Sequence, residues 1–106
     1  MEELRTEYLE SFDEKFTLWG ELFSQKDWYS LELEFHKMKG TGTTYGAPEV
    51  TELCKEMERI CRESDELPRD LLDAAIGLLT QIRDKYLNQK DFELADHPDF
   101  VSIKSK

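Results

Sequence analysis

The 106-residue chain has no long apolar segment. Its first residues, Met-Glu-Glu-Leu-Arg, lack the apolar stretch and the small-residue cleavage site of a signal peptide. No run approaches the roughly 20 apolar residues that a membrane-spanning helix needs. We therefore expect a cytoplasmic protein that does not enter the membrane. The initiating methionine and the lysine at the end favour a complete chain.

Positive charge is also scarce, because 14 Lys and Arg residues face 24 Asp and Glu residues and the net charge is -10. An acidic surface repels phosphates, and no basic cluster stands out to override that repulsion. Nucleic acid is therefore excluded as the expected partner. The length suits one domain with a single modest core, and the acidic charge favours a soluble monomer.

Cysteine is limited to Cys54 and Cys61, which lie seven residues apart on one predicted helical face. Two helical turns separate them by about 10 Å, which is too far for a disulfide. Two cysteines and a stray histidine are also too few for a zinc site. We expect reduced core cysteines and no metal. There is also no nucleotide-binding loop or carboxylate cluster to support an autonomous kinase or phosphatase.

Apolar residues recur every three or four positions, which is the spacing of helices and not of strands. The pattern predicts four helical runs, at about 2–25, 28–46, 48–63 and 68–88. Short loops between them favour an all-α, antiparallel up-and-down four-helix bundle over residues 1–88. We expect the C-terminal tail, residues 89–106, to pack partly on this bundle.

Local signals set the limits of these runs. Asp27 is a predicted N-cap for the second helix, and Pro48 opens the third in its first turn. Gly20 weakens the first helix without ending it. In the tail, Pro98 limits regular structure, and His97 is interpreted as a solvated loop histidine without a motif.

The most informative segment is residues 36–42, His-Lys-Met-Lys-Gly-Thr-Gly. Each helical glycine costs about 1 kcal/mol relative to alanine, and packing offers no evident reason for either one. Chemistry at His36 is the favoured explanation. This histidine lies about 100° from the core residue Phe35 and therefore points toward solvent. Lys39, on the same flank one turn later, can reach a group attached to the imidazole.

A partner for His36 follows from the turn at residues 46–47. If the two adjoining helices are antiparallel, Glu58 comes level with His36, since each lies about eleven residues, or about 16 Å, from that turn. Glu58 would accept a hydrogen bond from Nδ1–H and leave Nε2 as the nucleophile. The alternative is that Glu58 pairs with Arg62 or Lys55 on its own helix.

These residues resemble the signature of histidine-containing phosphotransfer (HPt) domains. The pattern is a histidine, any residue, an apolar residue, Lys-Gly and small residues, then a Gly-Ala turn, a Leu-Cys pair and an apolar-acidic pair. It spans about 23 consecutive residues, 36–58. The resemblance implies a four-helix bundle whose histidine takes a phosphoryl group from a receiver-domain aspartate and passes it to another receiver.

Carried over by position, the resemblance makes His36 the phosphoacceptor and Glu58 the residue that holds its imidazole. Lys39 would offset the phosphoryl charge, Gly40 would leave room for the receiver's aspartate loop, and Arg62 would lie near the phosphate. The implied partners are response-regulator receiver domains or a hybrid histidine kinase. The receiver brings the Mg²⁺, so we expect a phosphocarrier without a bound cofactor and not an enzyme.

The segment departs from the family pattern at Glu34 and Phe35, where apolar and small residues are commoner. Thr41 and Gly42 also replace the commoner Ser-Ser or Ser-Ala. These changes leave the choice of receiver open. Leu33, outside the core stripe, is our candidate for the docking surface. The alternative function is a helical-bundle adaptor that binds a signalling partner without being phosphorylated.

Overall fold

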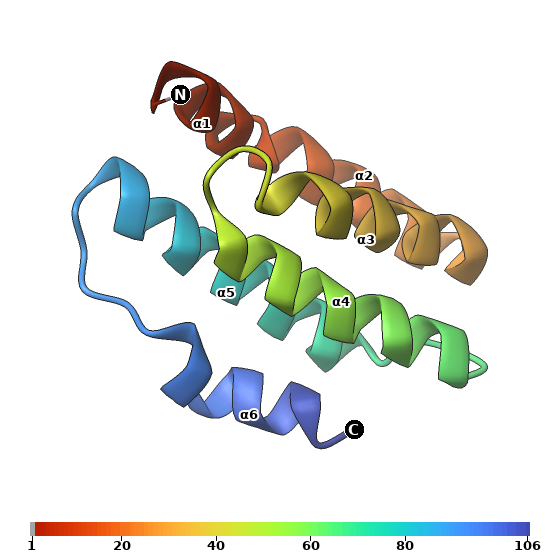
Figure 1. Ribbon diagram of the computed structural model, residues 1–106. Helices are drawn as coiled ribbons and strands as arrows, with labels where there is room; N and C mark the ends of the chain where they lie inside the picture. The colour runs from red at the N-terminus through yellow and green to blue at the C-terminus, as the bar shows by residue number, and fades with distance from the viewer. Residues whose placement is uncertain (1) are drawn as a thin grey trace.

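The computed structural model describes residues 2–106, which form helices and no strand. The elements are α1 (Glu2–Glu10), α2 (Phe12–Ser24), α3 (Trp28–Gly42), α4 (Pro48–Glu63), α5 (Arg69–Leu87), η1 (Leu94–Asp96) and α6 (Pro98–Lys104). In Figure 1, α2, α3, α4 and α5 run up and down in turn, and α1 extends the line of α2. The predicted all-α bundle is confirmed.

The first helical run is interrupted at Ser11 and not at Gly20. The Ser11 hydroxyl donates to the carbonyl of Tyr8 at 2.6 Å, a local bond that competes with regular helix. Leu4 lies on the apolar spacing of this run but is 52% exposed, whereas Leu9 is buried.

The core is built from side chains of every long helix. Trp19 of α2 and Phe35 of α3 are fully buried, with ring centroids 4.9 Å apart. The indole N–H of Trp19 donates to a carboxylate oxygen of Glu34 at 3.2 Å. Glu34 and Phe35, the two residues before His36 that depart from the family pattern, therefore both contact Trp19. Burial also raises the pKa of the free Cys61 thiol to about 12.

The connection between α3 and α4 is tight. Gly46 has a φ of +84°, which favours glycine, and Pro48 occupies the first turn of α4 as predicted. At Gly42, a Cβ would lie 2.6 Å from the backbone nitrogen of Thr51 and 3.0 Å from the carbonyl oxygen of Ala47. The expectation that packing requires neither glycine is therefore wrong for Gly42.

The tail is more regular than Pro98 suggested, because this proline opens α6 and does not prevent it. His97 is the N-cap, with Nδ1 accepting a hydrogen bond from the backbone N–H of Asp99 at 3.1 Å. It is therefore not a merely solvated loop residue. Phe100 and Ile103 are buried, and α6 packs on α4 and α5 (Figure 1). We propose that the tail and the bundle fold as one unit.

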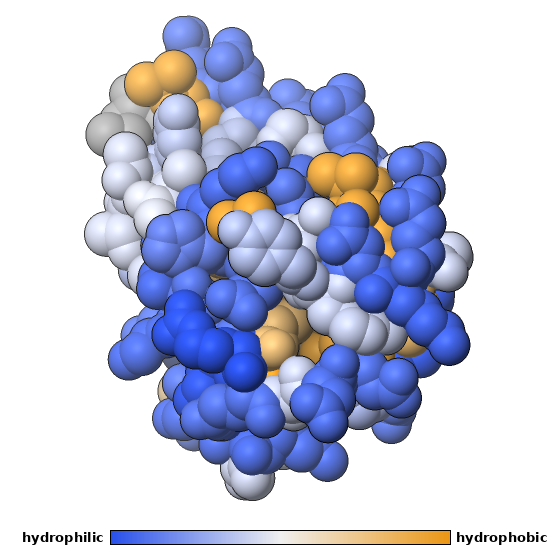
Figure 2. All heavy atoms as spheres, turned by 90° about the vertical axis from the view of Figure 1, so that its right-hand side faces the viewer, coloured by the Kyte–Doolittle hydropathy of each residue, from blue (hydrophilic) through white to orange (hydrophobic). Residues whose placement is uncertain are grey.

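The face of the molecule drawn in Figure 2 is largely polar. In the view of Figure 2 the apolar atoms form small, separate patches among hydrophilic side chains. Among residues 2–106, none of the helices combines the length and the apolar character needed to cross a membrane.

Candidate functional site

His36 lies on the outer side of α3. Its helical neighbours Phe35 and Met38 are buried, and this turns the imidazole outward, where its side chain is 58% exposed. Nδ1 lies 2.6 Å from Oε2 of Glu58 on α4. Because an ionised carboxylate only accepts hydrogen bonds, Nδ1 is the donor, and in the neutral imidazole Nε2 then keeps its lone pair. The imidazole is thus held through Nδ1 and exposed to solvent.

Glu58 is a buried carboxylate that connects three donors. Only 3% of the residue is exposed. Besides His36, it contacts the Lys39 ammonium at 2.5 Å and the Arg62 guanidinium at 2.9 Å. Burial alone would raise the pKa of this carboxyl, but hydrogen bonds and charge from Lys39 and His36 outweigh it and lower the pKa. Glu58 therefore pairs with His36 and Lys39 on α3 and with Arg62 on its own helix.

The cations of this cluster are paired but remain within reach of solvent. The side chain of Lys39 is 33% exposed and that of Arg62 is 62% exposed. Arg62 Nε also lies 3.7 Å from a carboxylate oxygen of Glu32 on α3. Two cations therefore face the two carboxylates of Glu58 and Glu32. With His36 neutral, the formal charge of the cluster is 2 - 2 = 0.

A second group of residues lies on the exposed face of α3 around His36. Gly40 has open space where a side chain would stand, and Leu33 is 39% exposed. Tyr29, at 71% exposure, was missed by the sequence analysis. It lies seven residues before His36, which places both side chains on one helical face. This spacing could have identified Tyr29 from the sequence.

The family model described as "Hpt domain" matches residues 3–86. The chain belongs to the Hpt domain family. The match runs from α1 to near the end of α5, and it includes all six predicted site residues, His36, Lys39, Glu58, Gly40, Leu33 and Arg62. Searches of curated proteins and of solved structures each gave no significant match.

Membership of the Hpt family indicates the general activity of the chain. Hpt domains carry phosphoryl groups on histidine in phosphorelays, typically as intermediates and not as catalytic enzymes. They generally act with receiver domains and need no cofactor. In the part of this Hpt domain that the structure describes, no group of three or more His, Cys, Asp or Glu side chains is arranged to hold a metal ion.

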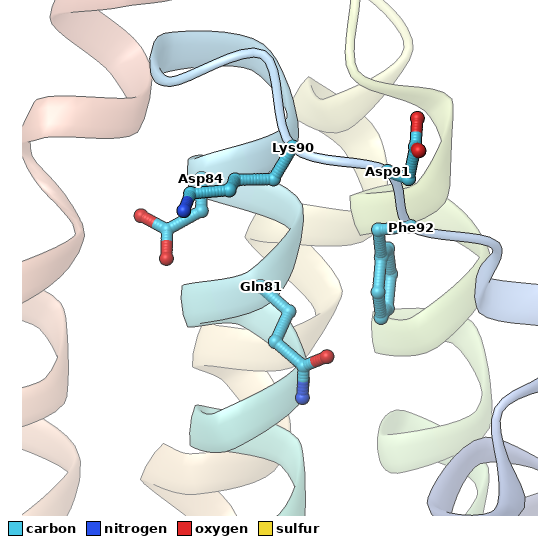
Figure 3. A pocket seen from close by; sticks show the side chains of 5 residues that line it. All are labelled: Gln81, Asp84, Lys90, Asp91 and Phe92. Carbon is cyan, nitrogen blue, oxygen red and sulfur yellow. The ribbon is translucent and has the colours of Figure 1, made fainter.

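A surface pocket of about 250 Å³ lies elsewhere on the Hpt chain. Figure 3 shows Gln81 and Asp84 on α5, with Lys90, Asp91 and Phe92 on the segment that follows. None of these residues belongs to the Glu58 cluster. The site around His36 is an exposed helical surface, which suits a reaction whose second reactant is another protein.

Proposed function

We propose that Nε2 of His36 accepts a phosphoryl group from the aspartyl phosphate of one receiver domain and passes it to the aspartate of another. The observation that carries this proposal is the exposed imidazole held through Nδ1 by the buried Glu58. The Nε2 lone pair forms the N–P bond while the acyl P–O bond breaks, and the aspartate leaves as a carboxylate. Glu58 stabilises the positive charge that develops on the ring.

Lys39 and Arg62 are the proposed counter-charges for the phosphorylated state. A phosphoryl group brings a charge of about -1.5 to -2 near neutral pH. Both cations contact Glu58, which also holds the imidazole, and their side chains reach solvent, so each can turn toward Nε2. Because Glu58 still holds Nδ1–H, the imidazole keeps its orientation while the cations redistribute. The Mg²⁺ of the transfer reaction would belong to the receiver.

The exposed face of α3 is the proposed receiver contact. Gly40 lets the partner's backbone approach His36 without a side chain in between. Leu33 and Tyr29 supply apolar and aromatic surface beside the imidazole, and aromatic residues are enriched at protein interfaces. This arrangement supports docking through α3 with His36 near the centre of the contact.

The test is to mix the chain with receiver domains carrying radiolabelled phosphate, loaded from acetyl phosphate and Mg²⁺. We expect acid-labile, base-stable label on the chain, and none on His36→Gln. His97→Gln is the matched control and should be labelled like the wild type. Label that persists on His36→Gln would place the phosphate elsewhere. Receiver binding without any label on the wild type would favour the adaptor function instead.

A further inference from the structure

Thr51, the fourth residue of α4, makes an unusual set of contacts with the end of α3. Its hydroxyl oxygen accepts hydrogen bonds from the backbone N–H of Thr43 at 2.8 Å and from the Thr43 hydroxyl at 3.1 Å. The same hydroxyl donates to the carbonyl of Lys39 at 2.9 Å. A threonine hydroxyl has one donor and two acceptor lone pairs, so its hydrogen-bonding capacity is fully used.

These bonds place the hydroxyl inside the backbone ladder of α3. In an α-helix the N–H of one residue bonds to the carbonyl four positions earlier, and Thr43 and Lys39 have this spacing. The Thr51 hydroxyl bridges that donor and that acceptor. A side chain inserted into the ladder is a known cause of local helix distortion. Here the affected turn is the one that carries Lys39 and Gly40.

Helix α4 therefore contacts Lys39 of α3 at two points, its backbone carbonyl and its ammonium group. Thr51 and Glu58 are seven residues apart, which places them on one face of α4 about 10 Å apart along the axis. Thr51 binds the backbone of Lys39, and Glu58 binds its ammonium at 2.5 Å. Beside the first point, the missing side chain of Gly42 lets the two backbones approach.

We propose that Thr51 is a positioning residue for phosphotransfer, whose hydroxyl holds the turn at Lys39 and Gly40 in the place from which Lys39 reaches Glu58 and a phosphoryl group on His36. The part that concerns phosphotransfer rests on the proposed function above. A misplacement of about 1 Å can slow an enzymatic reaction by about 100-fold, so a contact that holds this backbone turn can affect transfer without touching the phosphate.

The test compares Thr51→Val, which removes the hydroxyl but keeps the shape, with Thr51→Ser, which keeps the hydroxyl. Thr80→Val is the matched control, because the Thr80 hydroxyl also donates to a helical carbonyl at 2.9 Å, on α5. Transfer from a labelled receiver is measured over a range of receiver concentrations. We expect Thr51→Val to lower the maximal rate roughly tenfold, with an unchanged half-saturating concentration. Thr51→Ser and Thr80→Val should match the wild type.

A second measurement does not depend on phosphotransfer. Titration of the Glu58 carboxyl, followed by NMR, should show a higher pKa in Thr51→Val than in the wild type, because the contact with Lys39 is weakened. Thr51→Ala, which also lacks the hydroxyl, gives the same comparison if the valine variant does not fold. An unchanged Glu58 titration would overturn the positioning role. If no receiver labels the wild type, the proposed function fails, and the titration still decides the role of Thr51.

Discussion

Gly40 and Gly42 lie two residues apart, and the structure predicts opposite effects when each is replaced by alanine. At Gly40 an added Cβ meets nothing within 4 Å. At Gly42 it would lie 2.6 Å from both the backbone nitrogen and the hydroxyl oxygen of Thr51 and 3.0 Å from the carbonyl oxygen of Ala47. Two of these three atoms are backbone, so the collision cannot be relieved by rotating a side chain.

The magnitudes follow from these surroundings. Gly40→Ala should stabilise the fold by about 0.5–1 kcal/mol, because alanine loses less conformational entropy in a helix. Gly42→Ala gains the same helical term but incurs overpacking of about 2–3 kcal/mol, the upper part of the usual range. It should therefore destabilise the fold by about 1–2.5 kcal/mol. The two variants should differ by roughly 10 °C in melting temperature, at about 4 °C per kcal/mol.

Urea unfolding monitored by circular dichroism measures both changes, and transfer from a labelled receiver measures function. Gly40→Ala should transfer more slowly despite its higher stability, because its methyl group stands on the proposed receiver contact. Gly77→Ala is the control, since Gly77 on α5 also has open space around it and should be stabilised without a change in transfer. If Gly42→Ala proves as stable as Gly40→Ala, the close approach of α3 and α4 is refuted.

Other predictions concern the Glu58 cluster and the docking face. Glu58→Gln keeps an oxygen acceptor for Nδ1–H of His36 but removes the charge, and we expect a loss of about 1–2 kcal/mol at pH 7 in urea unfolding. The folded-state pKa of Glu58 is lowered, so its stabilising contribution is present above the usual glutamate range and is lost as the pH falls through the folded pKa. The stability difference between wild type and Glu58→Gln should therefore shrink in acid, and a constant difference between pH 7 and pH 3 would contradict this coupling. Lys39→Ala should shorten the lifetime of the phosphohistidine or slow its transfer while the bundle stays folded, and an unchanged label decay and rate would remove its role. Tyr29→Ala and Leu33→Ala should weaken receiver binding measured by titration, with stability changes within about 0.5 kcal/mol because both residues are exposed.

Much of the fold follows from local patterns in the chain. Residues on the apolar spacing, such as Trp19, Phe35 and Met57, are buried. Asp27 caps α3 through the backbone N–H of Ser30 at 3.1 Å, as its residue type predicts. The apolar spacing did not predict the interruption at Ser11. That interruption involves a hydrogen bond from the Ser11 side chain to the preceding turn, which leaves no trace in the spacing of apolar residues.

The pairing of His36 with Glu58 was predictable for a different reason. Two antiparallel helices joined by a tight turn bring equidistant residues level, so counting from residues 46–47 was enough to place the two side chains at one height. The roles assigned to Lys39, Gly40 and Arg62 came from the family resemblance and remain proposals. Membership in the Hpt family is confirmed by the match over residues 3–86.

The sequence by itself determined the helical periodicity, the tight turn and the outward direction of His36, because these depend on residue type and on spacing within one helix. Only the tertiary structure decided that Glu58 binds His36, Lys39 and Arg62 together, and that Gly42 is needed for packing against Thr51. Those facts depend on the distance between α3 and α4. The distance between α3 and α4 is set by atoms on both helices, so it cannot be predicted from the residue pattern of either helix alone.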